Sequence, residues 1–297
     1  MRNASLILSC VLVIMLAPVI ARADLSASQA RKLIAKTAGM NLPSGSIRVQ
    51  KPVMIDPDFA EAIAHIELVF RLKRDSSGVW RVAEVRVGQE RWEQLELIAR
   101  SAGRQLPPSK CDKKNQFQQP VASDLTVREA RCLLVALFEV QFPEDVVRIK
   151  SISGLGIPLA TEPSATVISL VRFGVRFKRD RSGWHTASFK TGMHPWISVE
   201  GVEGALAGVK ADQARDEMKT VAAALTKFRQ ERGTFVVSDK HPVLIDHLSP
   251  KYLGRVIRLD PWNNPYQYEG ETNHFTLRSA GPDGKMNTGD DVVLSSP

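Results

Sequence analysis

The chain has 297 residues, of which 43% are hydrophobic and 24% are charged, and its formal net charge is +8. This length is sufficient for two or three globular domains. The 40 basic residues are not gathered into any block of like charge. A mild and dispersed excess of this kind is typical of a solvated surface, so the composition argues against a nucleic-acid-binding protein.

The first 23 residues have the layout of a secretory signal peptide. Arg2 precedes an apolar stretch over residues 4–20, and a small-x-small site follows at residues 21–23. We expect cleavage after Ala23, which predicts a periplasmic or secreted protein without an integral membrane span. The alternative is an uncleaved anchor, because the stretch is close to the ~20 apolar residues that span a bilayer.

Two cysteines remain once the predicted signal peptide is removed, Cys111 and Cys132. An even number of cysteines in an exported chain can close a disulfide. Alternatively both are free thiols, since Cys132 lies on an apolar helix face where a buried cysteine is ordinary. The sequence leaves both possibilities open.

The chain repeats itself at an offset of 100 to 105 residues. The segment Leu-Lys-Arg-Asp at 72–75 recurs as Phe-Lys-Arg-Asp at 177–180, and each copy is followed by Ser-Gly and a tryptophan. Four of the five tryptophans thereby form two equivalent pairs, Trp80 with Trp184 and Trp92 with Trp196. Self-similarity at a fixed spacing predicts a tandem duplication.

Five segments follow from this pattern. We expect the signal peptide at residues 1–23, a first repeat at 24–101, and a linker rich in Pro, Lys, Gln and Ser at 102–123. A second repeat then covers residues 124–205. The remaining residues, 206–297, form a separate C-terminal domain.

Each repeat has the pattern of a small α+β module. In the first repeat, apolar residues at helical spacing predict helices over residues 26–38 and 90–101. Residues 46–55, 63–74 and 79–87 alternate as strands. The predicted order is α-β-β-β-α, with the helices on one face of an antiparallel sheet.

The opposite face of the predicted sheet carries polar residues such as His65, Glu67 and Arg71. Such a face is usually solvated, and the alternative is a binding face that the duplication presents twice. The paired tryptophans are interpreted as core residues, with ligand platforms as the alternative.

The C-terminal domain begins with an amphipathic helix over residues 212–232, which Gly233 ends. The sequence Asp-Pro-Trp-Asn-Asn-Pro-Tyr at 260–266 follows, and then Ser-Ala-Gly-Pro-Asp-Gly at 279–284. Two strands are expected, one over residues 266–268 and one over 274–277.

These motifs resemble the C-terminal domain of the major pseudopilin of type II secretion systems. The resemblance implies a helix packed on a small antiparallel sheet. The chain departs from the family at its N-terminus, since it has no basic prepilin leader with a Gly-Phe junction. Where family members usually have Gly, it has Asn263, which tolerates a positive φ best among other residues.

The resemblance also implies a calcium site in the acidic loop near the C-terminus. Calcium takes six to eight hard oxygen ligands, from carboxylates and main-chain carbonyls together. The expected ligands are the carboxylates of Asp283, Asp290 and Asp291 and main-chain oxygens near Leu277 and Ser279. The alternative is a polar turn whose acids are solvated or are balanced by Arg278 and Lys285.

No sequence motif of a hydrolase, metalloprotease, nucleotide-binding or dinucleotide-binding enzyme is present. We therefore expect a non-enzymatic envelope protein with a calcium-stabilised, pseudopilin-like domain that contacts proteins of a secretion or pilus machinery. The alternative is an exported ligand- or glycan-binding protein, or a hydrolase, that uses the duplicated modules. A concave pocket between the repeats would favour this alternative, whereas exposed apolar residues on the C-terminal domain would favour protein contacts.

Overall fold

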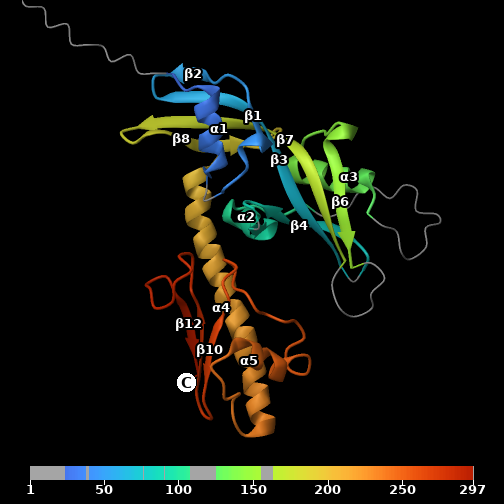
Figure 1. Cartoon of the computed structure of the whole chain (residues 1–297), viewed down its shortest axis with the longest axis vertical. Coiled ribbons are helices and arrows are strands. Elements are labelled where there is room, and N and C mark those ends of the chain that lie inside the picture. Colours follow the sequence, from blue (N-terminus) through green and yellow to red (C-terminus); the bar gives the residue numbers. More distant parts are fainter. Residues whose placement is uncertain are drawn as a thin grey trace, which may run out of the picture.

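The computed structural model describes residues 24–37, 40–75, 77–89, 91–107, 125–154 and 163–296. The predicted signal peptide and most of the predicted linker lie outside these ranges. The protein belongs to the α+β class, as the sequence predicts. A nine-stranded antiparallel sheet and a three-stranded sheet are connected by the long helix α4 (Val199–Arg232) (Figure 1).

Two long strands form the centre of the nine-stranded sheet, β3 (Phe59–Arg74) and β7 (Ser164–Asp180). They pair antiparallel along almost their whole length, and the pairing joins the two halves of the chain in one sheet. The other strands flank them: β1 (Ile47–Val49), β2 (Val53–Asp56), β4 (Trp80–Arg86), β5 (Trp92–Gln94), β6 (Val147–Ser153), β8 (Gly183–Lys190) and β9 (Ile197–Ser198).

The two halves of the sheet share their registers. Arg74 pairs with Trp80 in the first half, and Arg179 pairs with Trp184 in the second. At the same offset of 105 residues along the long strands, Ile66 pairs with its own equivalent, Val171. The pairing of β3 with β7 is therefore pseudo-symmetric about this point, and tandem duplication is the proposal that accounts for these matches.

Two helices cover one face of the large sheet, α1 (Ala27–Ala35) and α3 (Val127–Phe138). Ser26 and Gln29 form a capping box at the start of α1, so the predicted helix start is confirmed. Along β3, buried residues alternate with partly exposed ones, which is the pattern of a sheet with one covered face. Short 3₁₀ helices, η2 (Ser44–Ser46) and η3 (Glu144–Val146), precede β1 and β6.

The tryptophans occupy two kinds of place. Trp80 is buried in the core, as predicted. Trp92 and Trp196 are only partly buried, and each ring lies 4.0 Å from a guanidinium group, that of Arg71 or of Arg176. Cation–π contacts of this kind, not the core alone, hold these two rings.

The second helix of the first half starts later than the expected residue 90. Residues 92–94 form β5, because Trp92 pairs with Arg86 of β4, and α2 begins only at Leu95 and ends at Ser101. This pairing with a neighbouring strand overrides the helical spacing of the apolar residues.

Helix α4 is longer than the sequence suggests. It starts after the cap residue Ser198 and ends at Gly233, which adopts a φ of 84°. The expected domain boundary between residues 205 and 206 falls inside this continuous helix. Three glycines, at 201, 204 and 208, lower the helix propensity of its first turns, so sequence patterning finds only the later part.

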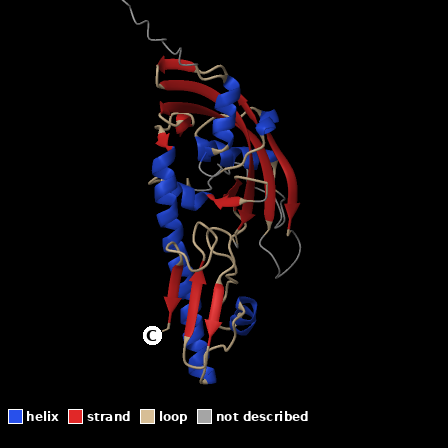
Figure 2. Cartoon of the chain, turned by 60° about the vertical axis from the view of Figure 1, so that its left-hand side comes forward, coloured by secondary structure: helices blue, strands red, loops and turns tan. Residues whose placement is uncertain are grey.

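The C-terminal sheet lies along the second half of α4 (Figure 2). It consists of β10 (Gln267–Gly270), β11 (Phe275–Ser279) and β12 (Val292–Ser295), with β11 in the centre. The short helix α5 (His241–Leu248) completes the domain. Buried side chains from all three parts, such as Met218, Leu225, Leu244 and Tyr268, form one core. The strand β12 is an addition to the two strands that the sequence predicts.

A buried ion pair joins the large sheet to α4. Lys210 Nζ lies 2.6 Å from Glu93 Oε2 of β5, and the two side chains are only 2% and 6% exposed. Arg91 binds the other carboxylate oxygen of Glu93 at 2.7 Å. Asn263 Nδ2 of the C-terminal domain also donates to the main-chain oxygen of Trp92, at 3.4 Å. The two sheets are thus connected by specific polar contacts as well as by the helix itself.

Cys132 is disulfide-bonded, and its partner lies outside the described residues, as does Cys111. The structure therefore excludes a free thiol at Cys132. Within the described ranges, no helix has both the length and the apolar composition needed to cross a bilayer.

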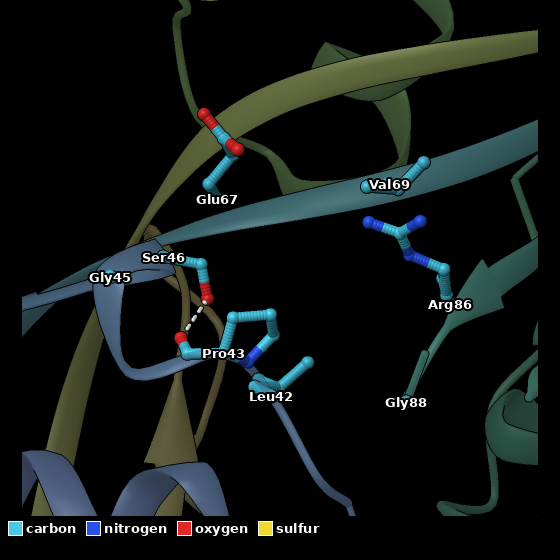
Figure 3. Close-up of a pocket in the computed structure, with 8 residues that line it drawn as sticks. All are labelled: Leu42, Pro43, Gly45, Ser46, Glu67, Val69, Arg86 and Gly88. Atoms are coloured by element: carbon cyan, nitrogen blue, oxygen red, sulfur yellow. Dashed lines mark hydrogen bonds between the residues drawn. The ribbon is translucent and has the colours of Figure 1, made fainter. Parts of the chain in front are cut away.

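A small cavity opens at the edge of the large sheet in the gap between β1 and β4 (Figure 3). It has a volume of about 180 Å³, and Val69, Glu67 and Arg86 line it together with the segment around Pro43. Val69 is one of the buried residues that line it, with an exposure of 7%. Space for a ligand is therefore small at this place in the sheet.

Candidate functional site

The acidic loop connects β11 to β12 and covers residues 280–291. Its backbone depends on glycine where it turns. Gly281 has a φ of 61°, and a Cβ atom there would lie 2.4 Å from the main-chain oxygen of Asp290. No other residue fits without a shift of the backbone. The loop is therefore folded back so that its two ends touch.

Three carboxylates approach one hydroxyl group in this loop. Thr288 Oγ1 donates to Asp290 Oδ1 at 2.6 Å, and it lies 3.4 Å from Asp291 Oδ1 and 3.5 Å from Asp283 Oδ1. The main-chain oxygen of Lys285 is 3.1 Å from the same hydroxyl. The structure thus brings the three predicted acids to one oxygen-rich place.

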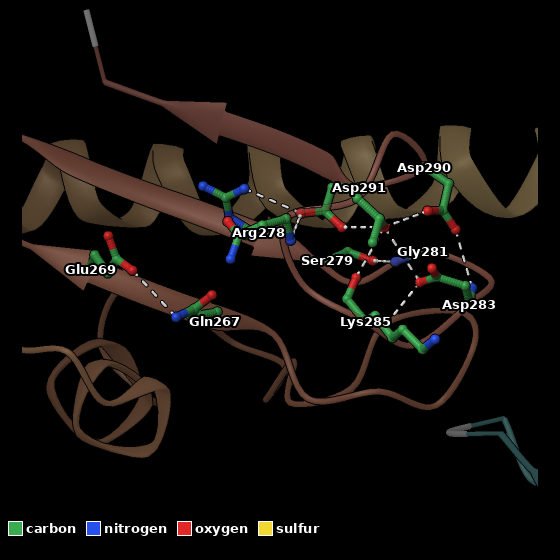
Figure 4. A network of polar contacts seen from close by, with 11 residues as sticks. Gln267, Glu269, Arg278, Ser279, Gly281, Asp283, Lys285, Asp290 and Asp291 are labelled. Carbon is green, nitrogen blue, oxygen red and sulfur yellow. Dashed lines mark hydrogen bonds and ion pairs between the residues drawn. The ribbon is translucent and has the colours of Figure 1, made fainter.

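The carboxylates are held by further hydrogen bonds (Figure 4). The main-chain N–H of Asp283 donates to Asp290 Oδ2 at 3.1 Å, and that of Asn287 donates to Asp291 Oδ2 at 2.8 Å. Arg278 also forms an ion pair with Asp291, at 3.2 Å. The balancing role that sequence analysis considers for Arg278 is therefore present at Asp291.

These contacts favour the ionised forms of Asp290 and Asp291. The Thr288 hydroxyl and the N–H of Asp283 lower the pKa of Asp290. Burial raises the pKa of Asp291, but hydrogen bonds from Asn287 and Arg278 outweigh it, and the pKa is lowered overall. A lowered pKa stabilises the fold above the pKa of the unfolded chain, and this contribution is lost as the pH falls through the folded value. The contacts within the loop therefore stabilise the charged carboxylates of Asp290 and Asp291 at neutral pH.

Asp260 is a polar centre that sequence analysis treats only as a turn residue. Its side chain is buried, with the residue 4% exposed, and it accepts hydrogen bonds from the N–H groups of Trp262 and Asn264 at 2.9 and 2.8 Å. The Ser279 hydroxyl donates to its other oxygen at 2.5 Å. Asn264 in turn donates to the main-chain oxygen of Gly281, at 3.1 Å. Asp260 therefore connects the Asp-Pro-Trp turn to the acidic loop.

The two predicted main-chain ligands lie in the sheet. Leu277 pairs with Tyr268 on one side and with Leu294 on the other, and Ser279 pairs with Val292. The Ser279 side chain points to Asp260. Their place beside the loop leaves their role as calcium ligands a prediction.

The donor chemistry of the loop fits a hard cation, because carboxylate, hydroxyl and carbonyl oxygens surround one point. Among the residues that the structure describes, no three acidic, histidine or cysteine side chains form a ready-made metal cluster. The carboxylates are engaged with Thr288, Asn287 and Arg278 instead.

Comparison with known families identifies the C-terminal part of the chain. Residues 202–295 match the model of the family described as type II secretion system (T2SS), protein G. The match begins near the start of α4 and ends at β12. It therefore covers most of this helix, the Asp-Pro-Trp turn and the acidic loop. No curated protein and no solved structure matches the chain.

Proposed function

We propose, from the match of residues 202–295 to the type II secretion protein G family, that the chain is an exported, non-enzymatic envelope protein. In this proposal its pseudopilin-like domain contacts proteins of the secretion machinery, and calcium stabilises that domain. The observation that carries the proposal is the matched segment itself, folded as a long helix against a three-stranded sheet.

Exposed apolar residues support a role in protein contacts. The C-terminal domain exposes four large hydrophobic side chains to solvent, at 46–65% of their full area: Val237, Val256, Leu259 and Val293. Valine and leucine at this exposure cost solvation free energy that a partner protein would recover. Scattered apolar residues are normal on a surface, so their role needs a direct test.

A photo-crosslinking amino acid in place of Leu259 tests the contact in cells that carry a type II secretion system. We expect crosslinked products that contain a pseudopilin or another component of that system. The control is the same amino acid at Val127, which is 44% exposed but lies on α3 of the large sheet. Products that are equally abundant at both positions, or no product with the machinery, would contradict the proposal.

The proposed calcium ion would be held by Asp283, Asp290 and Asp291. It would supply positive charge to a loop in which three acids lie around the Thr288 hydroxyl and one of them, Asp291, pairs with Arg278. A ligand that binds only the folded state at a hundred times its dissociation constant stabilises by about 2.7 kcal/mol. We therefore expect calcium to raise the melting temperature of the chelator-treated protein by several degrees.

The double variant Asp290→Asn/Asp291→Asn should lose this calcium-dependent increase. Asp212→Asn/Asp216→Asn is a matched control, because it removes two exposed acids from α4. Calorimetric titration measures the binding directly. If the wild-type protein binds no calcium at millimolar concentration, the acids serve as a polar turn paired with Thr288 and Arg278, and the calcium part of the proposal is wrong.

A further inference from the structure

A second and larger cavity, of about 640 Å³, lies on the large sheet where its two halves meet. Its floor contains Ile63 of β3 and the cross-strand partner of this residue, Gly174 of β7. Val53 and Ile55 of β2 form one side, and they are 64% and 61% exposed. Both halves thus contribute apolar surface to one open cavity.

The charged residues of this cavity are mostly basic. Lys51, Arg172 and Lys190 line it, and Glu61 is the one acid among its lining residues. Glu61 is already paired, since its Oε1 lies 2.7 Å from Arg176 Nε. Within the described part of the chain, none of the three cations forms an ion pair. The cavity therefore offers three positive charges that form no direct ion pair with an acid of the described residues.

Trp196 also lines the cavity and provides an aromatic surface there. Its ring lies 4.0 Å from the guanidinium of Arg176 and 4.8 Å from Lys190 Nζ. Gly174 makes this arrangement possible, because a Cβ atom at that position would lie 3.2 Å from the Trp196 ring and 3.1 Å from two carbons of Lys190. The glycine therefore lets the side chains of Lys190 and Trp196 pack directly over β7.

The equivalent place in the first half of the sheet differs in both size and charge. At the offset of 105 residues, Val69 stands where the second half has Gly174, and Glu67 stands where it has Arg172. The cavity there has only about 180 Å³ (Figure 3). The first half therefore lacks an open and basic cavity at the equivalent place, and its lining differs from that of the second half at these two positions.

We propose that the larger cavity binds a small anionic molecule with an apolar or aromatic part. Its volume lies in the range of about 300–1,000 Å³ that small-molecule sites occupy. The apolar floor and the Trp196 ring suit the uncharged part of such a ligand, and Lys51, Arg172 and Lys190 suit its carboxylate, sulfonate or phosphate group. None of the lining residues belongs to the C-terminal domain. A concave pocket between the two halves is the feature that favours a ligand-binding role.

Two fluorescent probes of similar shape test the proposal on the full mature chain. 8-Anilinonaphthalene-1-sulfonate carries a negative charge, whereas N-phenyl-1-naphthylamine is neutral. We expect saturable binding of the sulfonate, with energy transfer from tryptophan, and at least tenfold weaker binding of the neutral probe. The variant Arg172→Ala/Lys190→Ala should weaken sulfonate binding about tenfold and leave binding of the neutral probe unchanged.

Matched variants separate this site from other surfaces. Gly174→Val introduces the residue of the first half and should reduce binding of both probes, whereas Glu67→Ala in the smaller cavity should affect neither. Melting curves establish that each variant is folded; if Gly174→Val is not, Lys51→Ala replaces it, with a selective loss of sulfonate binding expected. Unchanged affinity for the sulfonate in the Arg172→Ala/Lys190→Ala variant would overturn the proposal.

Discussion

Replacing Lys210 by methionine is expected to lower the free energy of unfolding by about 3–5 kcal/mol. The substitution removes the partner of Glu93, a carboxylate that is 6% exposed and lies between β5 and α4. Arg91 remains bound to one oxygen of Glu93, and the other oxygen loses its only ion-pair contact among the described residues. Urea-induced unfolding, followed by tryptophan fluorescence, measures the change.

Two further variants show that the loss comes from buried charge. Lys219→Met removes an ion pair with Asp216 on the same helix, but those side chains are 67% and 74% exposed, so the cost should stay below about 1 kcal/mol. Adding Glu93→Ile to Lys210→Met should recover most of the loss, because it removes the unpaired charge. Isoleucine is chosen because Ile197 occupies the place in the second half of the sheet that is equivalent to Glu93. A change of less than 1 kcal/mol in Lys210→Met would contradict this account.

Asp260→Ala is expected to destabilise the C-terminal domain by about 3 kcal/mol. The substitution removes the acceptor for the N–H groups of Trp262 and Asn264 and for the fully buried hydroxyl of Ser279. Buried donors without acceptors cost about 1–3 kcal/mol each, so the effect exceeds that of one ordinary hydrogen bond. Thermal unfolding measures it, and hydrogen exchange of the loop amides shows whether the acidic loop opens first.

Asp246→Ala is the matched control for this prediction, because Asp246 is an exposed acid of α5 in the same domain. Its effect should lie within about 0.5 kcal/mol. Equal stability of Asp260→Ala and Asp246→Ala would show that the Asp-Pro-Trp turn holds its shape without the carboxylate. In that case, the hydrogen bonds that connect this turn to the acidic loop would not contribute to the free energy of unfolding.

If the acidic loop depends on Asp260, the two proposals for this protein become separable. The pseudopilin-like domain would lose its loop in Asp260→Ala, while the basic cavity on the large sheet would keep its shape. Crosslinking to the secretion machinery and binding of an anionic probe then respond to different variants. A protein with both properties would carry a ligand-binding sheet and a docking domain on one helix.

Local signals predicted much of the fold. The capping box at Ser26, the alternation along residues 63–74 and the stop at Gly233 are properties of short segments, and the structure confirms the elements that they predict. The glycine and aspartate pattern of residues 279–291 likewise predicts the acidic loop. Short-range patterns of this kind reflect backbone preferences, which act within a few residues.

The sequence does not predict the start of α4 or the short strand β5, because contacts with residues that are distant in the chain determine both. Residues 92–94 have helical spacing, yet pairing with β4 makes them a strand. The first turns of α4 contain three glycines, yet α4 packs against α2 and continues through them. In both cases, tertiary contacts outweigh local propensity.

The sequence by itself determined the α+β class and the likeness of the C-terminal part to type II secretion protein G, because each rests on patterns of residues that are close together in the chain. Only the tertiary structure decided that β3 and β7 join the two halves in one sheet and that one helix carries both sheets. It also decided that Glu93 meets Lys210, and that Gly174 lines a cavity together with residues of both halves. Burial and pairing of a side chain depend on residues more than a hundred positions away, and no local pattern specifies which strand edges or helix faces will meet.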